Sequence, residues 1–195
     1  MSVDRAPARG RTPRPVDPDL VDVRAAQADH AAFGTLYRRY LDRVYGYSFY
    51  LLGDHHDAED ATERTFVAAL SAIDRFRDEG ATFRSWLFRI AHNQLANALR
   101  ARSRLRTESL DGVAEPAAGD DPARQASLAD DAHRLRASVA SLSEDRRQVV
   151  ILRFVDGLTA REIGVVLGRS EGAVRVLQHR ALRELAVLLE RGAPD

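Results

Sequence analysis

The chain has 195 residues, 45% of them hydrophobic, and a formal net charge of zero, which suits one or two small domains and argues against indiscriminate coating of nucleic acid. It contains no Cys, so disulfides, thiol catalysis and Cys-ligated metal sites are excluded. No apolar run approaches the roughly 20 residues that span a bilayer, and the N-terminus lacks the apolar stretch of a secretory signal, so we expect a cytoplasmic protein without membrane insertion.

The first part of the chain is rich in Pro, Arg and Asp and has no hydrophobic periodicity, so we interpret residues 1–24 as a disordered tail. From residue 25 apolar and aromatic side chains recur every three or four residues, which predicts a helix that ends near Gly53. Aromatic residues at this spacing usually belong to a core, and we expect the following to be buried: Phe33, Leu36, Tyr37, Tyr40, Leu41, Val44, Tyr45 and Tyr47. This helix opens a first helical domain, predicted over residues 25–106.

A second helix, predicted over residues 57–76, has one apolar and one acidic side. The apolar stripe, which we expect to be buried, holds Phe66, Ala69, Leu70, Ile73 and Phe76. Asp60, Glu63, Val67 and Asp74 fall on the other side. These residues alone allow two interpretations of that side: a solvated acidic face, or a docking patch for a basic partner with Val67 as its apolar contact.

A third helix is predicted to begin near Thr82 and to carry an aromatic residue among arginines and amides. Opposite its apolar stripe lie Trp86, Arg89, Asn93, Asn97, Arg100 and Arg104. Proteins hold unstacked bases with such a set, because the ring stacks on a base, guanidinium groups follow phosphates and amides read base edges. The alternative is that the ring of Trp86 is buried in the core and the arginines only keep the helix soluble.

An acidic connector follows, rich in Gly, Pro and Ala, and we predict a flexible linker over residues 107–136. Such a linker lets two domains bind one extended partner and raises their effective concentration at it. Ser143, followed by two acidic residues, is a good N-cap for the next helix. A second helical domain is predicted over residues 137–190.

The second domain contains a predicted helix-turn-helix. Thr159 and Glu162 have the spacing of a capping box, and Gly168 suits the end of a short helix. Ser170 then caps a second helix whose apolar positions are Val174, Leu177, Ala181 and Leu185. The same helix carries Arg175, Gln178, His179 and Arg180, side chains that can contact base edges in a major groove. An ordinary helix pair in a bundle is the alternative.

Taken in order, these motifs resemble a bacterial RNA polymerase sigma factor of the extracytoplasmic-function (ECF) group. The resemblance covers about residues 33–106 and 142–189, and implies an all-α fold of two small helical domains joined by a flexible linker, the second a helix-turn-helix. It rests on Leu36–Tyr40, Asp57–Phe66, Phe83–Asn93 and the helix-turn-helix.

The resemblance also implies that the protein is not an enzyme and needs no metal or other cofactor. It further implies a role for each of three surfaces. Docking on the polymerase core is implied for Asp57, Asp60, Glu63 and Val67. Recognition and melting of the −10 promoter element are implied for Arg84, Trp86, Arg89, Asn93, Asn97 and Arg100. Recognition of the −35 element is implied for Ser170, Glu171, Arg175, Gln178, His179 and Arg180. The implied partners are core RNA polymerase and promoter DNA, and an anti-sigma factor is a common partner in this group.

Two positions depart from the family pattern. Arg64 stands where the family usually has an acid, so the docking face is less acidic than is typical. Leu177-Gln178 is inverted relative to the usual Arg-Leu order, which would place Leu177 in the core and turn Gln178 toward DNA, or else rotate the helix slightly.

Two other classes of protein compete with this interpretation. His55, His56 and Asp57 could belong to an HD-type metal-dependent phosphohydrolase, but consecutive helical residues point in different directions and a metal site needs converging ligands. A free-standing helix-turn-helix regulator would explain the second domain alone. It leaves the Trp86 face and the acidic helix without a role.

Overall fold

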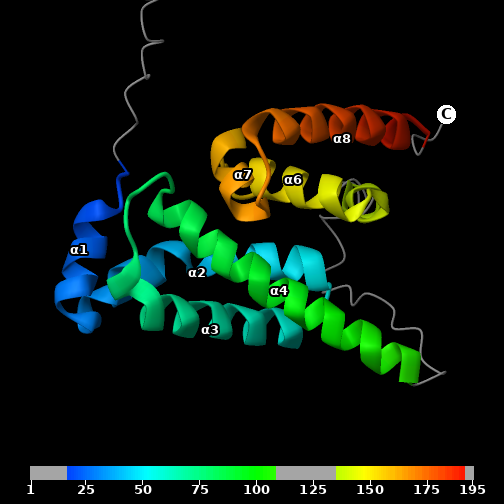
Figure 1. Ribbon diagram of the computed structural model, residues 1–195. Helices are drawn as coiled ribbons and strands as arrows, with labels where there is room; N and C mark the ends of the chain where they lie inside the picture. The colour runs from blue at the N-terminus through cyan, green and yellow to red at the C-terminus, as the bar shows by residue number, and fades with distance from the viewer. Residues whose placement is uncertain (1–16, 109–134, 192–195) are drawn as a thin grey trace, which may run out of the picture.

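The computed structural model describes residues 17–108 and 135–191, and all regular elements in those two ranges are helical (Figure 1). The predicted all-α class is confirmed. The elements are α1 (Leu20–Ala28), η1 (His30–Ala32), α2 (Phe33–Leu52), α3 (His55–Ala72), η2 (Ile73–Arg75), α4 (Phe83–Glu108), α6 (Glu144–Phe154), α7 (Ala160–Leu167) and α8 (Glu171–Arg191). Residues 135–141 are also helical and precede α6.

The first helical unit is built around the hairpin of α2 and α3, crossed by α4 (Figure 1). Gly53 ends α2 in the left-handed conformation, with φ 71°, and Asp54 accepts a hydrogen bond from Asp57 N at 2.9 Å to cap α3. The stripe predicted on the third helix is buried at Phe83, Leu87, Ala91 and Leu95, as expected. These side chains meet the buried residues of the hairpin, chief among them Phe33, Leu36, Tyr40, Val44, Tyr47 and Phe66.

The second helical unit is the predicted helix-turn-helix with α6 as its support. The capping box is complete, since Thr159 Oγ1 accepts from Glu162 N and the Glu162 carboxylate accepts from Thr159 N. Gly168 ends α7 with φ 64°. A Cβ added at Gly164 would lie 2.6 Å from the backbone oxygen of Arg169, so only glycine lets α7 approach the turn this closely.

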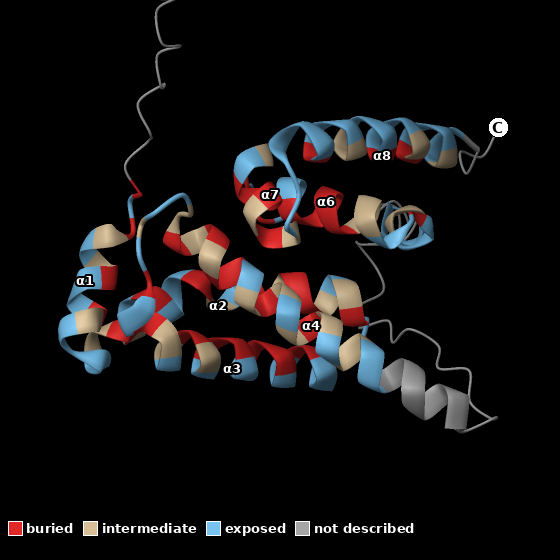
Figure 2. Cartoon of the chain, viewed as in Figure 1, coloured by how far each residue is buried: buried red, intermediate tan, exposed pale blue. Residues whose placement is uncertain are grey.

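The two units are packed against each other. Helix α7 contacts α4, and α6 contacts α2. Val149, Ile151, Leu152, Leu158 and Ile163 of the second unit belong to the same buried cluster as the core of the first. Figure 2 shows buried residues on α4, α6 and α7 where the units face each other.

The structure moves several predicted boundaries. The tail predicted over residues 1–24 is wrong for its last part, because α1 begins at Leu20 and Val23 is buried. This helix lacks a strong apolar stripe, and the residues before it, Asp17 and Asp19, accept hydrogen bonds from distant Phe83 N and Tyr40 Oη, which a local pattern does not reveal. The predicted linker begins and ends in helix, at residues 107–108 and 135–136. The rest of the linker and residues 1–16 lie outside the described ranges.

Candidate nucleic-acid and partner interfaces

The acidic side of α3 faces solvent. Asp57, Asp60, Glu63 and Val67 are all exposed, and Val67 shows 58% of its surface. They form one continuous face with two edges. Glu63 and Val67 border a groove toward α2, whereas Asp57 and Asp60 border a second hollow toward α4 together with Arg64. Arg64 donates to Asp60 at 3.3 Å, an exposed pair that partly neutralises this edge.

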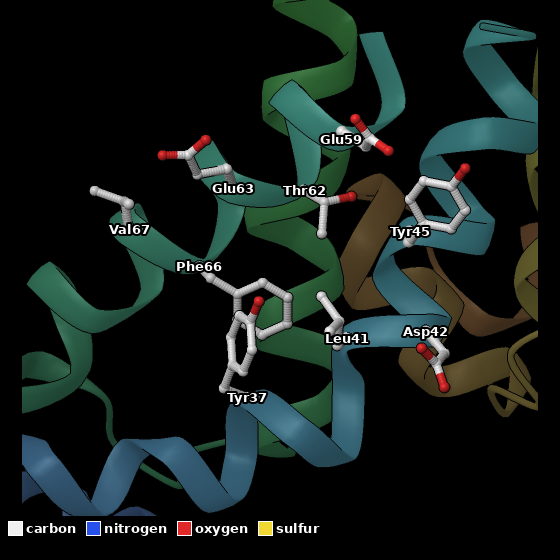
Figure 3. Close-up of a pocket in the computed structure, with 9 residues that line it drawn as sticks. All are labelled: Tyr37, Leu41, Asp42, Tyr45, Glu59, Thr62, Glu63, Phe66 and Val67. Atoms are coloured by element: carbon white, nitrogen blue, oxygen red, sulfur yellow. The ribbon is translucent and has the colours of Figure 1, made fainter. Parts of the chain in front are cut away.

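The groove between α2 and α3 has an apolar floor and an acidic rim, in a volume of about 530 Å³ (Figure 3). Its lining residues are Tyr37, Leu41, Asp42, Tyr45, Glu59, Thr62, Glu63, Phe66 and Val67. The rings of Tyr37 and Phe66 meet edge to face with centroids 4.7 Å apart. The prediction that Tyr37 belongs to the core is wrong, because it is 40% exposed. Positions 37, 41 and 45 form a second helical stripe beside the buried one. This four-residue spacing was the signal in the sequence that could have revealed the groove.

Most of the predicted −10 residues share one side of α4. Arg89, Asn93, Asn97 and Arg100 are exposed, and Arg100 donates to Asn97 Oδ1 at 3.0 Å. The side chain of Arg104 lies outside the described residues. Trp86 is partly buried and partly accessible, so each of the two interpretations of its ring is correct in part. The ring packs on Phe76 and Phe83, with centroids 5.2 and 5.6 Å away, and the rest of it remains accessible. The structure therefore presents a polar strip with an aromatic ring at its N-terminal end.

Arg84 is not brought together with this set. Its guanidinium points to the second unit, where Nη2 lies 2.6 Å from Glu162 Oε2 and Nε lies 3.2 Å from Glu162 Oε1. Thr82 Oγ1 also donates to Glu162 Oε1 at 2.9 Å. Burial alone would raise the pKa of Glu162, but the hydrogen bonds from Arg84, Thr159 and Thr82 together lower it.

Sequence analysis missed two buried carboxylates, of which one caps α4 and the other binds α2. Asp17 Oδ2 accepts from Phe83 N at 2.5 Å, so it caps α4 from 66 positions away. Asp19 accepts from Tyr40 Oη and from Arg39, each at 2.5 Å. Burial, followed by the bond to Asp19, raises the pKa of Tyr40. Both carboxylates sit in a stretch that resembles a tail in composition, so no local signal marked them.

The predicted −35 residues lie along the first half of α8. Ser170 Oγ accepts from Ala173 N at 3.2 Å, which confirms its capping role. Arg175 pairs with Glu171 one turn away at 2.5 Å, and both side chains are largely exposed, as are His179 and Arg180. Leu177 packs against the core and Gln178 is half-buried. The core position expected for Leu177 is thus confirmed.

The histidines that suggested a phosphohydrolase do not converge on a metal position. His55 stacks on Phe49 with ring centroids 4.4 Å apart, and its Nδ1 lies 2.5 Å from Tyr45 Oη. Over residues 17–108 and 135–191, no group of three or more His, Cys, Asp or Glu side chains could hold an ion. In the same ranges no helix is both long and apolar enough to cross a membrane.

The two helical units present three surfaces: a helix hairpin with an acidic groove, a polar helix with one accessible ring, and an exposed helix-turn-helix. Such a set suits a protein that binds a protein partner and DNA. Comparison with known proteins identifies its family. The model of sigma-70 region 2 matches residues 36–105, and that of sigma-70 region 4 matches residues 132–185. The chain belongs to the ECF RNA polymerase sigma factors.

Individual relatives agree with this assignment. The chain is 39% identical to the ECF sigma factor BldN of Streptomyces coelicolor over 86% of its own length, and spans 64% of BldN. It is 32% identical to the ECF sigma factor SigE of Mycolicibacterium smegmatis over 93% of its length, spanning 70% of SigE. Among solved structures, it is similar to the sigma factor RpoE of Bartonella quintana, crystallised with the anti-sigma factor NepR, at 27% identity and a TM-score of 0.69, covering 83% of this chain and 98% of that one.

Proposed function

We propose that this protein binds the RNA polymerase core and directs transcription initiation at promoters that it recognises through −35 and −10 elements. The observation that carries this proposal is the presence of both sigma modules, region 2 and region 4, in one chain and in that order. A free-standing regulator would use only the second of them. Sigma factors are non-catalytic, so the polymerase performs the chemistry of RNA synthesis.

The acidic face of α3 and its groove are the proposed docking site for the polymerase core. A partner surface with basic residues and an apolar side chain would suit it, since Glu63 and Val67 lie side by side at the rim and Phe66 lines the floor (Figure 3). Asp57 and Asp60 extend the acidic face along α3. Complementary charge of this kind speeds encounter and selects the partner more than it adds affinity.

The exposed side of α4 is the proposed site of −10 recognition and melting. Trp86 has an accessible ring surface held by Phe76 and Phe83, so a base leaving the duplex can stack without the side chain losing further freedom. Arg89, Asn93, Asn97 and Arg100 continue along the strip with groups for phosphates and base edges.

The first half of α8 is the proposed reader of the −35 element. Exposed ion pairs contribute little to stability, so Arg175 can exchange Glu171 for a phosphate or a guanine edge at small cost. Gln178, His179 and Arg180 follow within the next turn, and Ser170 with Glu171 holds the N-terminus of the helix.

An anti-sigma factor and a cytoplasmic location complete the proposal. RpoE of Bartonella quintana was crystallised with the anti-sigma factor NepR, and its similarity to this chain supports a partner of the same class here.

Run-off transcription tests the function directly. Core polymerase from Streptomyces coelicolor, the organism of the relative BldN, is incubated with a promoter pool with and without this protein. Discrete new start sites that need the protein are expected. Absence of any core binding, together with tight specific binding to duplex DNA alone, would contradict the proposal and favour a free-standing regulator.

A further inference from the structure

One side chain of α1 reaches the turn that follows α3. The amide nitrogen of Gln27 donates to the backbone oxygen of Ile73 at 2.9 Å and to that of Phe76 at 3.1 Å. Phe76 N donates to Ile73 O at 3.0 Å, so both carbonyls belong to the single turn of η2. The two hydrogens of one amide thus hold both ends of this turn. We call these two hydrogen bonds the Gln27 clamp.

The Gln27 clamp fixes the residue at which the chain leaves the helix. Phe76 follows η2 with extended backbone angles, φ −61° and ψ 131°, and begins the loop to α4. Its carbonyl binds α1, whereas its ring is buried and meets the rings of Phe83 and Trp86, with centroids 5.9 and 5.2 Å away. Gln27 is therefore connected to Trp86 through one intervening residue.

The two phenylalanines that support Trp86 are positioned in different ways. Phe83 is the first residue of α4, less than one turn before Trp86, so the two side chains move together with their helix. Phe76 lies outside α4, and its position depends on η2 and on the clamp. Phe76 is thus the support through which α1 can set the orientation of the Trp86 ring.

We propose that Gln27 is a positioning residue for promoter melting, because it holds Phe76 and thereby orients the Trp86 ring for stacking on a base that leaves the duplex. This inference rests on the proposed function of Trp86. A ring that is already held in place loses little freedom when a base stacks on it, so more of the stacking energy supports melting. The proposal gives a role to α1, which precedes the residues matched by the region 2 model.

Solvent can replace the clamp without unfolding the region. Gln27 is half-buried and lines, together with Phe76 and Arg77, a hollow of about 470 Å³ between α1 and the loop. Arg77 Nη1 also donates to Phe76 O at 2.9 Å, so this carbonyl keeps a partner when the amide is lost. A carbonyl that water can reach costs less than a buried one when its donor is removed. Loss of the clamp should therefore loosen Phe76 more than it lowers stability.

Fluorescence of Trp86 tests the positioning step without polymerase, because Trp86 is the only Trp in the chain. Gln27→Met keeps the length of the side chain but has no hydrogen-bond donor. In the full-length protein it should shift the emission of Trp86 to the red and increase its quenching by acrylamide. Gln27→Lys retains donor hydrogens for the two carbonyls and should restore the wild-type emission.

Permanganate reactivity of the promoter then tests the functional step. Holoenzyme with Gln27→Met should form open complexes on the order of tenfold less well than wild type, at unchanged affinity for core polymerase, and Gln27→Lys should recover most of the melting. His30→Ala is the matched control. His30 Nε2 lies 3.2 Å from Asp74 Oδ1, so this side chain also reaches η2 but touches neither carbonyl. The control should leave emission and melting unchanged.

Three results would overturn the positioning role while leaving the proposed function intact. They are unchanged Trp86 emission in Gln27→Met, equal changes in Gln27→Met and His30→Ala, and altered emission with normal melting. Absence of core binding by the wild type would instead overturn the proposed function and, with it, the role of Gln27 in melting.

Discussion

The two DNA-reading surfaces of this protein are built in opposite ways. In region 4, α8 is capped by Ser170, and its exposed Arg175 pairs with Glu171, one turn away. In region 2, the start of α4 is capped by Asp17 from a distant part of the chain, and Arg84 is held by Glu162 of the other region. The surface of α8 is thus determined locally, whereas that of α4 depends on contacts between distant residues.

This difference has a functional meaning. A locally determined helix is ready to bind whenever the protein is folded. A helix whose first turn depends on distant partners changes when those partners move, so the DNA-reading surface of region 2 depends on the tertiary packing around it. Variants that disturb each surface separately test this difference between the two regions.

Gly164→Ala should have the largest effect and should disturb region 4 alone. The new Cβ would lie 2.6 Å from the backbone oxygen of Arg169. A backbone atom cannot move aside as easily as the end of a flexible side chain. We expect a loss of about 2–3 kcal/mol of unfolding free energy, measured by thermal or chemical denaturation. Gly172→Ala is the control, because apart from the neighbouring backbone of its own helix no atom of the described residues lies within 4 Å of its Cβ position, and it should be neutral or slightly stabilising. Equal stability of the two variants would contradict the close approach.

Trp86→Ala should reduce promoter melting far more than core binding. Stacking of one base on an aromatic ring contributes about 1–3 kcal/mol, so open-complex formation should fall roughly 5- to 100-fold. Permanganate reactivity of unpaired thymines reports melting, and a polymerase pull-down reports core affinity. A parallel loss of both, or of neither, would count against the stacking role.

Asp17→Ala should loosen the start of α4 and lower melting by roughly tenfold, because it leaves the buried Phe83 N–H without its acceptor. Asp17→Asn retains an acceptor oxygen and should recover most of the activity. Asp29→Ala is the control: Asp29 also caps a helix in region 2, accepting from Ala31 N at 2.9 Å, but it is remote from α4. Failure of Asp17→Asn to rescue melting would argue against a positioning role.

The contact between the two helical units should depend on pH through Asp156. Burial raises the pKa of Asp156 from 3.8 to about 7, although Arg43 of α2 and Arg84 of α4 oppose the shift. The packed arrangement of the two units therefore binds this proton more tightly than a state in which the carboxyl is hydrated. The contact should be strongest near pH 4, weaken as pH rises toward 7 and be constant above it, each unit costing up to about 1.4 kcal/mol.

Other titratable groups at the interface also bear on the pH dependence, and their contributions must be separated from that of Asp156. Tyr47 of α2 also faces Asp156, and burial raises its pKa beyond this range. His92 of α4 contacts Tyr47, and burial lowers its pKa, so acidification below its ordinary value of 6.5 weakens the packing that buries it. The difference between wild type and Asp156→Asn in unfolding free energy, measured across this pH range, isolates the carboxyl. Identical pH profiles of the two proteins would contradict a role for Asp156.

Sequence reasoning succeeded where structure is local. The capping box of Thr159 and Glu162, the glycine at 168 and the buried stripe of α4 all follow from spacing within one or two turns. It did not detect that Glu162 also binds Arg84, 78 positions earlier, or that Asp17 caps α4. Nothing in a single sequence marks such pairs, because each partner has an ordinary local explanation. For this reason the sequence did not predict that Arg84 lies apart from the other residues expected to recognise the −10 element.

The central claim is that one chain, bound to the polymerase core, places its two regions on two separate promoter elements. DNA cleavage from tethered reagents tests it most directly, since Ala173→Cys on α8 and Ala101→Cys on α4 are both exposed and would each be the only Cys. On a promoter found by run-off transcription, the holoenzyme should give cuts near −35 from position 173 and near −10 from position 101, about 25 base pairs apart. Cuts from both positions at one place would contradict the account.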